Sequence, residues 1–249
     1  MDYQIKWDKK DGEHIRENKM SSEILADLVG RSFPVEAGDR ILEIGGGNDF
    51  FAKSAAAKGY DVTVIDCDEN APAAKDKKIT FVNADWASID ADDPALKDGF
   101  KVVVCNFSTA VHDMDSIRKV NQIADHCLIN RFLMYKEPMM DRFCRELDLK
   151  IKPIIPNLKE QYVEIGNNST FTGHRAQVYF SDYHWENALS PKDAAKRFLD
   201  WYYGDKEVPE GMEQAALEAA KKMAVDGVVN DPVNAHIAHL HWSMDSIGF

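Results

Sequence analysis

Short apolar runs that each end in a polar residue alternate with amphipathic segments over the first 150 residues. The runs predict five strands: Ile41–Ile44, Asp61–Ile65, Ile79–Val82, Phe100–Cys105 and Cys127–Asn130. Helices are predicted over Phe51–Lys58, around Ile117–Ala124 behind a cap at Asp113 or Asp115, and over Pro138–Leu147. Near-continuous apolar strands that alternate with helices are typical of a parallel sheet covered on both faces. The pattern therefore predicts an α/β protein with a doubly wound sheet.

The pattern is looser at both ends of the chain. A helix is expected from Ser21 or Ser22 to Gly30, because its apolar residues share one face. Beyond residue 151 the sequence predicts strands at Gln161–Ile165 and Ala176–Tyr183, helices at Ser190–Gly204 and Glu210–Val225, and a last strand at Ala235–Trp242. We therefore divide the chain into an N-terminal flap and helix (1–36), a core (37–185), a helical insertion (186–230) and a final strand that completes the sheet (231–249).

Composition narrows the class of protein. The 249 residues are 45% hydrophobic, which suits one α/β domain with an addition or two small lobes. Four cysteines without a C-x-x-C pair favour a reducing compartment, and no segment reads as a bilayer span or a secretion signal. We expect a cytoplasmic protein with no membrane partner. The net charge of −12 and the lack of a basic cluster argue against general nucleic-acid binding and favour a small or cationic substrate.

The first strand of the core ends in three glycines, Gly45, Gly46 and Gly47, and a helix-favouring segment follows. Glycine is needed where φ is positive or where a ligand presses on the main chain. A strand, a tight turn and a helix in this order are typical of a nucleotide-type site at the carboxyl edge of a sheet. A nicotinamide site would require a further glycine where this chain has Phe50, and Glu43 would repel a pyrophosphate.

The next three strands also end in polar residues. Asp66 follows the second strand, about twenty residues after the glycines, and suits hydrogen bonds to ribose hydroxyls. Asp85 follows the third strand beside Trp86, a pair that suits the amine and the face of a purine. Asn106 ends the fourth strand. These residue types at neighbouring strand ends predict an adenosine-binding site.

The segments E-I-G-G-G, V-I-D, N-A-D-W and N-F-S, taken together, resemble the successive motifs of the class I S-adenosylmethionine-dependent methyltransferases over roughly Ala37–Phe132. The segment N-F-S-T-A-V-H-D and the two-helix insertion before the last strand resemble members with a Methyltransf_11-like core. The resemblance implies a seven-stranded, mostly parallel Rossmann-like sheet of order 3-2-1-4-5-7-6 with a small helical cap. It also implies that the last strand inserts antiparallel.

The resemblance assigns S-adenosyl-L-methionine, with S-adenosyl-L-homocysteine as product, to the residues at the strand ends: Glu43, Gly45, Gly46, Gly47, Asp66, Cys67, Asp85, Trp86 and Asn106. By this resemblance the glycines contact the methionine and ribose parts, and Asp66 binds the ribose hydroxyls. Cys67 flanks the adenine and Asp85 binds its amine. Asn106 lies near the methionine end. Glu43 could instead be only a charged residue at a strand edge, and Asp66 and Asp85 could be ordinary acids of solvated turns. Trp86 could be an ordinary residue of the hydrophobic core.

His112 lies just beyond the fourth strand, where the transferred methyl group would emerge, so it is a candidate catalytic base. A loop histidine bonded to the backbone is the alternative. The sulfonium is already a strong electrophile, so an essential base is not required. We expect methyl transfer to a small-molecule acceptor selected by the insertion. The alternatives are a non-catalytic cofactor-binding or partner-binding module, and methylation of a protein or RNA. The oligomeric state does not follow from the sequence.

Two further groups of residues allow more than one interpretation. His239 and His241 would share one face of the last strand and His236 the other, but no acid or cysteine is spaced to complete a metal shell, so no metal is expected. Tyr3, Trp7 and His14 could form a flap over the cofactor or belong to a disordered N-terminus.

Overall fold

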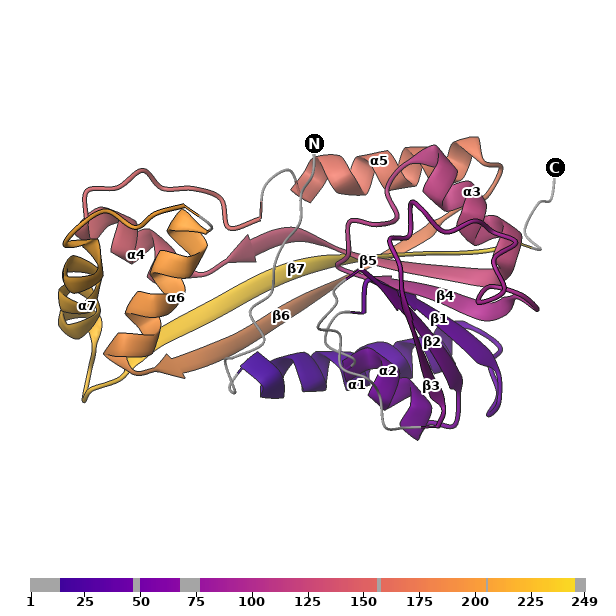
Figure 1. Cartoon of the computed structure of the whole chain (residues 1–249), viewed down its shortest axis with the longest axis horizontal. Coiled ribbons are helices and arrows are strands. Elements are labelled where there is room, and N and C mark those ends of the chain that lie inside the picture. The colour runs from indigo at the N-terminus through magenta and orange to yellow at the C-terminus, as the bar shows by residue number, and fades with distance from the viewer. Residues whose placement is uncertain (1–13, 47–49, 68–76, 156–157, 205, 245–249) are drawn as a thin grey trace. The chain divides into compact units, whose positions relative to one another are not determined.

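The computed structural model describes residues 14–46, 50–67, 77–155, 158–204 and 206–244. Its helices are α1 (His14–Ser32), α2 (Phe50–Ala57), α3 (Met114–Ile123), α4 (Pro138–Glu146), α5 (Leu158–Phe171), α6 (Pro191–Tyr203) and α7 (Met212–Met223). Its strands are β1 (Arg40–Ile44), β2 (Asp61–Asp66), β3 (Ile79–Asn83), β4 (Phe100–Asn106), β5 (Ala124–Lys136), β6 (Gln177–Leu189) and β7 (Val229–Ser243). The strands form one sheet of order β3-β2-β1-β4-β5-β7-β6 (Figure 1).

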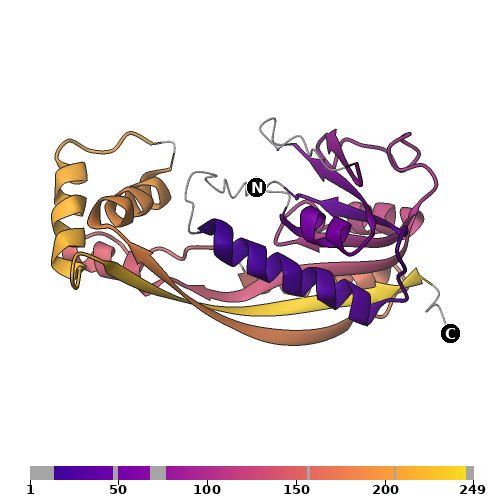
Figure 2. The same ribbon diagram turned by 90° about the horizontal axis from the view of Figure 1, so that it is seen from below.

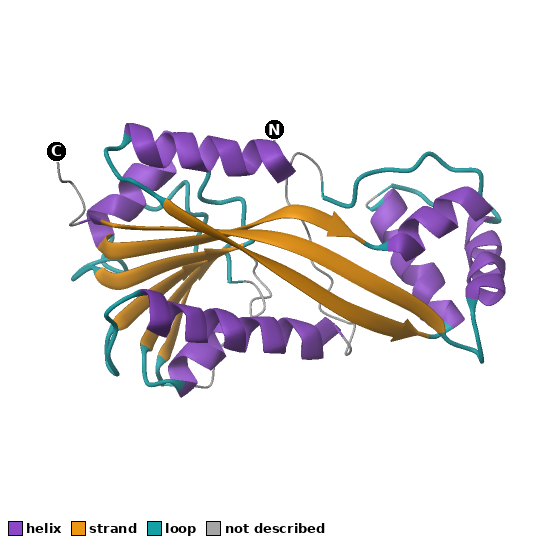
Figure 3. Cartoon of the chain, turned by 180° about the vertical axis from the view of Figure 1, so that it is seen from behind, coloured by secondary structure: helices purple, strands orange, loops and turns teal. Residues whose placement is uncertain are grey.

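The sheet is mostly parallel, as the sequence predicted. β1 pairs in parallel with β2 and β4, β2 with β3, and β4 with β5. β7 runs against β5, because His126 contacts Ser243 whereas Asn130, four residues further along β5, contacts His239, four residues earlier in β7. The expected fold class and strand order are therefore confirmed, with the antiparallel last strand between β5 and β6 (Figure 3).

The chain forms two compact units. The second unit comprises Leu133–Leu158 and Asp182–Ile237, and the first comprises the rest of the chain. The unit boundaries fall inside β5, β6 and β7, so each of these strands contributes residues to both units. Each unit has a hydrophobic core of its own.

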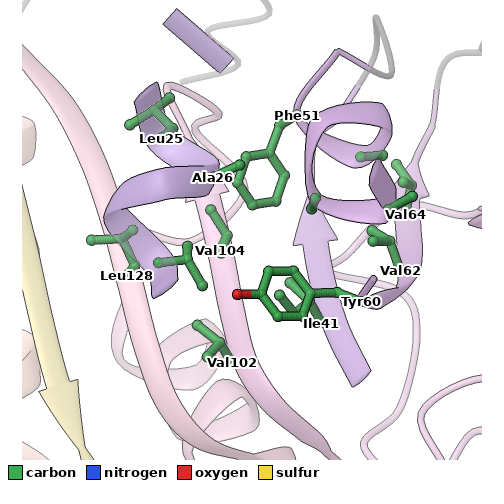
Figure 4. Packing of buried hydrophobic residues seen from close by; sticks show 14 of the residues in the cluster. Leu25, Ala26, Ile41, Phe51, Tyr60, Val62, Val64, Val102, Val104 and Leu128 are labelled. Carbon is green, nitrogen blue, oxygen red and sulfur yellow. The ribbon is translucent and has the colours of Figure 1, made fainter. Parts of the chain in front are cut away.

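In the first unit, helices cover both faces of the sheet: α1 and α2 lie on one face, and α3 and α5 on the other (Figures 1 and 2). The core under α1 and α2 is built from Leu25, Phe51, Ile41, Val64 and Val104, among others (Figure 4). The buried face of α2 is otherwise alanine, which lets the helix pack close to the strands.

The first helix is longer than predicted at both ends. It begins at His14 rather than at Ser21 or Ser22, and it continues past Gly30 to Ser32. Gly30 is an interior position at which a Cβ would lie 3.1 Å from the Tyr60 hydroxyl. The glycine therefore makes room for a neighbouring side chain rather than ending the helix.

The strand predicted at Gln161–Ile165 is wrong, because this segment lies inside α5. Val163 and Ile165 would share one face of a strand, but in the helix Ile165 is fully buried whereas Val163 is half-exposed. A short helical segment can show the same alternation of apolar and polar residues in its sequence although only one of its residues is buried. Five residues were therefore too few to distinguish the helical period from the strand period.

The second unit consists of α4, α6 and α7 with the parts of the long strands that adjoin them. Ser190 caps α6 through a hydrogen bond from the Asp193 amide, and Gly204 ends it with a φ of 57°, as the sequence predicted. Phe143 of α4 stacks on Phe198 of α6 with 4.6 Å between the ring centres. Because α4 shares this core, the unit extends beyond the predicted insertion at 186–230.

Two properties of the described residues concern membrane spanning and the state of the cysteines. None of the helices in the described ranges combines the length and the apolar character that crossing a bilayer requires. All four cysteines are free thiols; Cys105, Cys127 and Cys144 are buried and Cys67 is exposed.

Candidate functional site

The parallel register places the predicted residues at one edge of the first unit's sheet. Ile44 pairs with Ile65 and Asp66 with Asn83, so β1, β2 and β3 end together. Asn106, the last residue of β4, pairs with Asn130. Since all these strands run in one direction, their carboxyl ends form a single edge, which is where ligands bind in sheets of this kind.

The glycine turn is required by packing. Gly45 has a φ of 77°, and its amide donates to the Ile65 carbonyl over 2.8 Å, which bends the chain away from β1. A Cβ on Gly45 would lie 2.1 Å from the Ser108 Oγ. A Cβ on Gly46 would lie 2.7 Å from the Glu43 carboxyl group and from Val64. The first two glycines therefore admit no side chain, and Gly47 lies outside the described residues.

Glu43 is a buried acid below this turn, with only 3% of its surface exposed. It stands in β1 opposite Val64 and Val104 of the neighbouring strands, and its carboxyl group lies directly under Gly46. A carboxylate enclosed between apolar strands at the base of a glycine turn is suited to a cationic group bound above it.

The residues that follow β2 and β3 are more accessible. Asp66 is half-buried at the end of β2, and Cys67 is exposed. Asp85 is exposed, and its Oδ1 accepts a hydrogen bond of 3.1 Å from the Ala87 amide. The carboxyl group of Asp85 therefore holds the turn after β3, which is the turn role that the sequence left open for this acid.

Trp86 lies in the interior and not at the open edge, since only 2% of its surface is exposed. The Lys119 Nζ lies 4.6 Å from the centre of its ring and donates to the carbonyls of Trp86 and Ile89. Burial, ahead of the opposing influence of nearby aspartates, lowers the pKa of Lys119. The structure thus places Trp86 in the interior, with the ammonium group of Lys119 over its ring.

Asn106 is linked to two residues, Asn130 and His239, that the sequence did not connect with the site. Its Oδ1 accepts a hydrogen bond of 2.5 Å from the Asn130 Nδ2, and Asn130 is fully buried. Among the described residues no hydrogen-bond partner faces the buried Nδ2 of Asn106. The His239 Nδ1 lies 2.6 Å from the Asn130 Oδ1. Only the pairing of distant strands reveals this connection, since His239 and Asn130 are 109 residues apart.

His112 lies in the segment between β4 and α3 and is exposed. Its Nδ1 lies 2.8 Å from the Thr109 carbonyl oxygen and therefore donates to it. The His112 carbonyl accepts from the Asn168 Nδ2 of α5 over 2.9 Å, which ties the segment to that helix. The buried guanidinium of Arg131 donates to the Val111 carbonyl over 2.8 Å. The segment is held on two sides, and the Nε2 of His112 takes no part in these contacts.

The three histidines of β7 have separate surroundings. His236 lies 2.7 Å from Asp182, whereas His239 and His241 both contact the ring of Tyr179. The shared face of His239 and His241 agrees with the strand geometry. Nowhere in the described ranges do three histidine, cysteine or acidic side chains come together in a group that could hold a metal ion.

Comparison with known proteins gives a family. The model of the Methyltransf_23 family, described as a methyltransferase domain, matches residues 13–217. None of the curated proteins compared with the chain matches it. A proposed type II methyltransferase from Anaeromyxobacter dehalogenans is similar in structure, with a TM-score of 0.57, 13% identity, and coverage of 89% of this chain and 96% of that one.

A second solved structure shares the fold. It is a proposed methyltransferase from an antibiotic biosynthesis pathway of Anabaena variabilis, with a TM-score of 0.53, 12% identity, and coverage of 85% of this chain and 96% of that one. The strand order of the sheet and the family match over most of the chain agree. The chain therefore belongs to the Methyltransf_23 family of methyltransferase domains, within the class I S-adenosylmethionine-dependent methyltransferases.

Proposed function

We propose that the protein transfers a methyl group from S-adenosyl-L-methionine to a small-molecule acceptor and releases S-adenosyl-L-homocysteine. The observation that carries this proposal is the edge of the sheet at which the strands ending in Asp66 and Asn106 lie on either side of β1, whose glycine turn has no room for a side chain and packs on Glu43. The family match supports the same reaction class.

The chemistry of this edge fits the cofactor. The Asp66 carboxylate would accept hydrogen bonds from the ribose hydroxyls, and the carboxyl of Glu43 would balance the positive charge of the aminoacyl part. The turn at Gly45 and Gly46, which packs against Ser108 and Glu43, would present its main chain to the ligand. The buried Asn106 Nδ2, which no described residue satisfies, is a donor for an acceptor atom at the methionine end.

The base of the cofactor would lie beyond β2 and β3. Asp85 would accept a hydrogen bond from the adenine amine, and Cys67 would flank the ring. Trp86 would support this part from below, because its ring is enclosed and covered by Lys119. We infer that Trp86 shapes the floor of the adenine subsite through packing.

The bound cofactor supplies an electrophilic methyl group on a sulfonium, which the acceptor attacks in line with the S–CH₃ bond. The protein must hold the acceptor in that line and exclude water, and such positioning is worth roughly 7–11 kcal/mol in favourable cases. An acceptor that carries a proton needs a base. The Nε2 of His112 can take that proton, because its Nδ1 already donates to the Thr109 carbonyl.

The acceptor is proposed to be a small molecule because of the acidic balance of the chain. We assign its selection to the helical insertion at 186–230, and we place the reaction in the cytoplasm. No general nucleic-acid or membrane partner is part of the proposal.

Calorimetry with S-adenosylhomocysteine tests the cofactor assignment. We expect binding at micromolar strength, its loss in Asp66→Ala, and its retention in Asp61→Ala. Asp61 is the matched control, since it is an exposed acid at the opposite end of the same strand. Binding of NAD, with no heat from either form of the cofactor, would refute the proposal.

Product formation separates the enzyme from other uses of the fold. Incubation with the methyl donor and a metabolite extract should generate S-adenosylhomocysteine. Binding without turnover would instead indicate a non-catalytic cofactor-binding module. Transfer of a labelled methyl group to macromolecules of a lysate, and not to metabolites, would indicate a protein or RNA acceptor.

A further inference from the structure

Four neighbouring strands of the first unit are joined by a line of side-chain hydrogen bonds. The Asn130 Nδ2 donates to the Asn106 Oδ1 over 2.5 Å, linking β5 to β4. The His239 Nδ1 of β7 lies 2.6 Å from the Asn130 Oδ1. The His239 Nε2 lies 3.0 Å from the Ser181 Oγ of β6. We name these four residues the cross-strand relay; it follows the sheet order β4-β5-β7-β6.

The hydrogen-bond partners determine which atoms of the cross-strand relay carry a proton. An amide oxygen only accepts, so the contact with the Asn130 Oδ1 places a proton on the His239 Nδ1. Burial lowers the pKa of His239 to about 4, so its ring is neutral and Nε2 carries a lone pair. The Ser181 hydroxyl must then donate to Nε2. The direction of donation therefore runs unbroken from Ser181 to Asn106.

This direction decides how Asn106 is oriented. Its Oδ1 is occupied by Asn130, so its Nδ2 is turned to the other side. That nitrogen is buried and has no hydrogen-bond partner among the described residues. A buried donor without an acceptor is unfavourable in a folded protein and calls for an explanation. Asn106 ends β4 at the carboxyl edge, two residues before the serine that packs on the glycine turn.

We propose that His239 is a positioning residue of the methyl-donor site: through Asn130 it holds the Asn106 amide so that Nδ2 donates to a carboxylate oxygen of the cofactor's amino-acid part. The inference rests on the proposed function and extends it to a residue on the last strand. His239 does not touch the ligand in this arrangement. It acts by fixing which end of the Asn106 amide faces the cofactor.

Two ligands and two substitutions test this role by calorimetry. S-Adenosylhomocysteine carries the amino-acid part, whereas methylthioadenosine has the same nucleoside without it. His239→Leu removes the hydrogen bonds and keeps an apolar volume. We expect it to weaken S-adenosylhomocysteine about tenfold, the size of one oriented hydrogen bond, and to leave methylthioadenosine unchanged. His239→Asn can still donate to Asn130, so its affinity should stay within about threefold of the wild type.

A double-mutant cycle asks whether His239 acts through Asn106. In an Asn106→Ala background, His239→Leu should have no further effect on affinity for S-adenosylhomocysteine. Ser181→Ala is the substitution that changes the structure least, because it removes a single hydroxyl group. It still tests the proposal if His239→Leu does not fold. It should weaken S-adenosylhomocysteine about threefold and leave methylthioadenosine unchanged.

Other results would overturn the relay. Equal losses for both ligands, additive losses in the cycle, or wild-type affinity in folded His239→Leu and Ser181→Ala would each show that His239 serves only packing. A wild-type protein that binds neither S-adenosylhomocysteine nor its methyl-donor form would refute the proposed function itself, which distinguishes the two failures.

Discussion

Ser108 occupies the space that a side chain on Gly45 would need. A Cβ on Gly45 would lie 2.1 Å from the Oγ and 2.3 Å from the Cβ of Ser108. The contact joins the turn after β1 to the segment after β4. The two segments that flank the candidate site are therefore packed as one piece, and the position of the turn depends on the absence of a side chain.

Gly45→Ala should destabilise the protein and weaken cofactor binding. The left-handed backbone costs an alanine about 1–2 kcal/mol, and the clash with Ser108 adds about 1–3 kcal/mol. Urea denaturation measures the loss, and calorimetry should show S-adenosylhomocysteine binding reduced by about tenfold or more. Gly166→Ala is the control, because this helical glycine has open space around it and should gain about 0.5–1 kcal/mol. Wild-type stability of Gly45→Ala would contradict the packing argument.

The strand ends could be predicted from the sequence because each lies where a buried apolar run stops. Asp66 and Asn106 each follow such a run, and parallel pairing then brings them to one edge without any knowledge of side-chain contacts. Similar local reasoning placed helix starts at Asp113 or Asp115 and at Ser190, and the structure shows the caps at Asp113 and Ser190, since a cap depends on residues three positions away. The strand ends and the helix caps could be predicted because each depends on residues that are close in the sequence.

The remaining features depend on contacts between distant segments. Asn130 reads as one more residue of a buried strand, and its partners Asn106 and His239 come from neighbouring strands. Sequence spacing placed His239 on one face of β7 but gave no sign of what faces it. Ser108 is similar, because nothing near it in sequence indicates that it packs on Gly45. The helix at α5 was missed because Ile165 is fully buried and Val163, two residues earlier, is half-exposed, so the segment predicted as a strand sets no helical period of its own.

Asp113 should contribute to stability and not to chemistry. Its Oδ1 accepts from the Ser116 amide over 2.8 Å, and the Ser116 Oγ accepts from the Asp113 amide over 3.1 Å. Asp113→Ala should therefore cost about 1 kcal/mol, measured by urea denaturation. Asp113→Asn keeps a capping oxygen and should retain both stability and methyl transfer. If Asp113→Asn remained stable but lost turnover, the residue would have a catalytic role.

Arg197 should be essential to the second unit because it pairs with a buried acid. Its Nη2 donates to the Glu137 Oε1 over 2.6 Å, and the Tyr135 hydroxyl donates to the same oxygen over 2.7 Å. Burial, and next to it the charge of Asp231, raises the pKa of Glu137, while Arg197 opposes the rise. Arg197→Met leaves this carboxylate without its guanidinium partner and with only the Tyr135 hydroxyl, at an expected cost of about 3–5 kcal/mol at neutral pH.

The cost of Arg197→Met should depend on pH. Without the guanidinium the pKa of Glu137 rises further, so acid neutralises the carboxyl group and restores part of the lost stability. Adding Glu137→Gln should do the same at neutral pH. Thermal unfolding followed by circular dichroism measures both effects. Equal destabilisation at pH 5 and pH 7, with no rescue by Glu137→Gln, would show that Arg197 acts through packing alone.

The buried imidazole of His239 should make the first unit sensitive to acid. Burial lowers its pKa from 6.5 to about 4, so the unfolded chain binds a proton before the folded one does. The stabilisation is complete above about pH 6.5 and is lost as the pH falls toward 4. The difference between the two pKa values corresponds to roughly 3 kcal/mol. His241 has a pKa lowered by burial as well and adds to the same trend.

The contribution of His239 can be isolated by comparing unfolding free energies of the wild type and His239→Asn between pH 7.5 and 4. Glu137 and Asp231 have pKa values raised by burial and act in the opposite direction, but they are present in both proteins and cancel in the comparison. The wild type should lose roughly 3 kcal/mol more than the variant over this range. Parallel curves would mean that the ring is hydrated or charged in the folded state, and they would also remove the neutral tautomer on which the orientation of Asn106 depends.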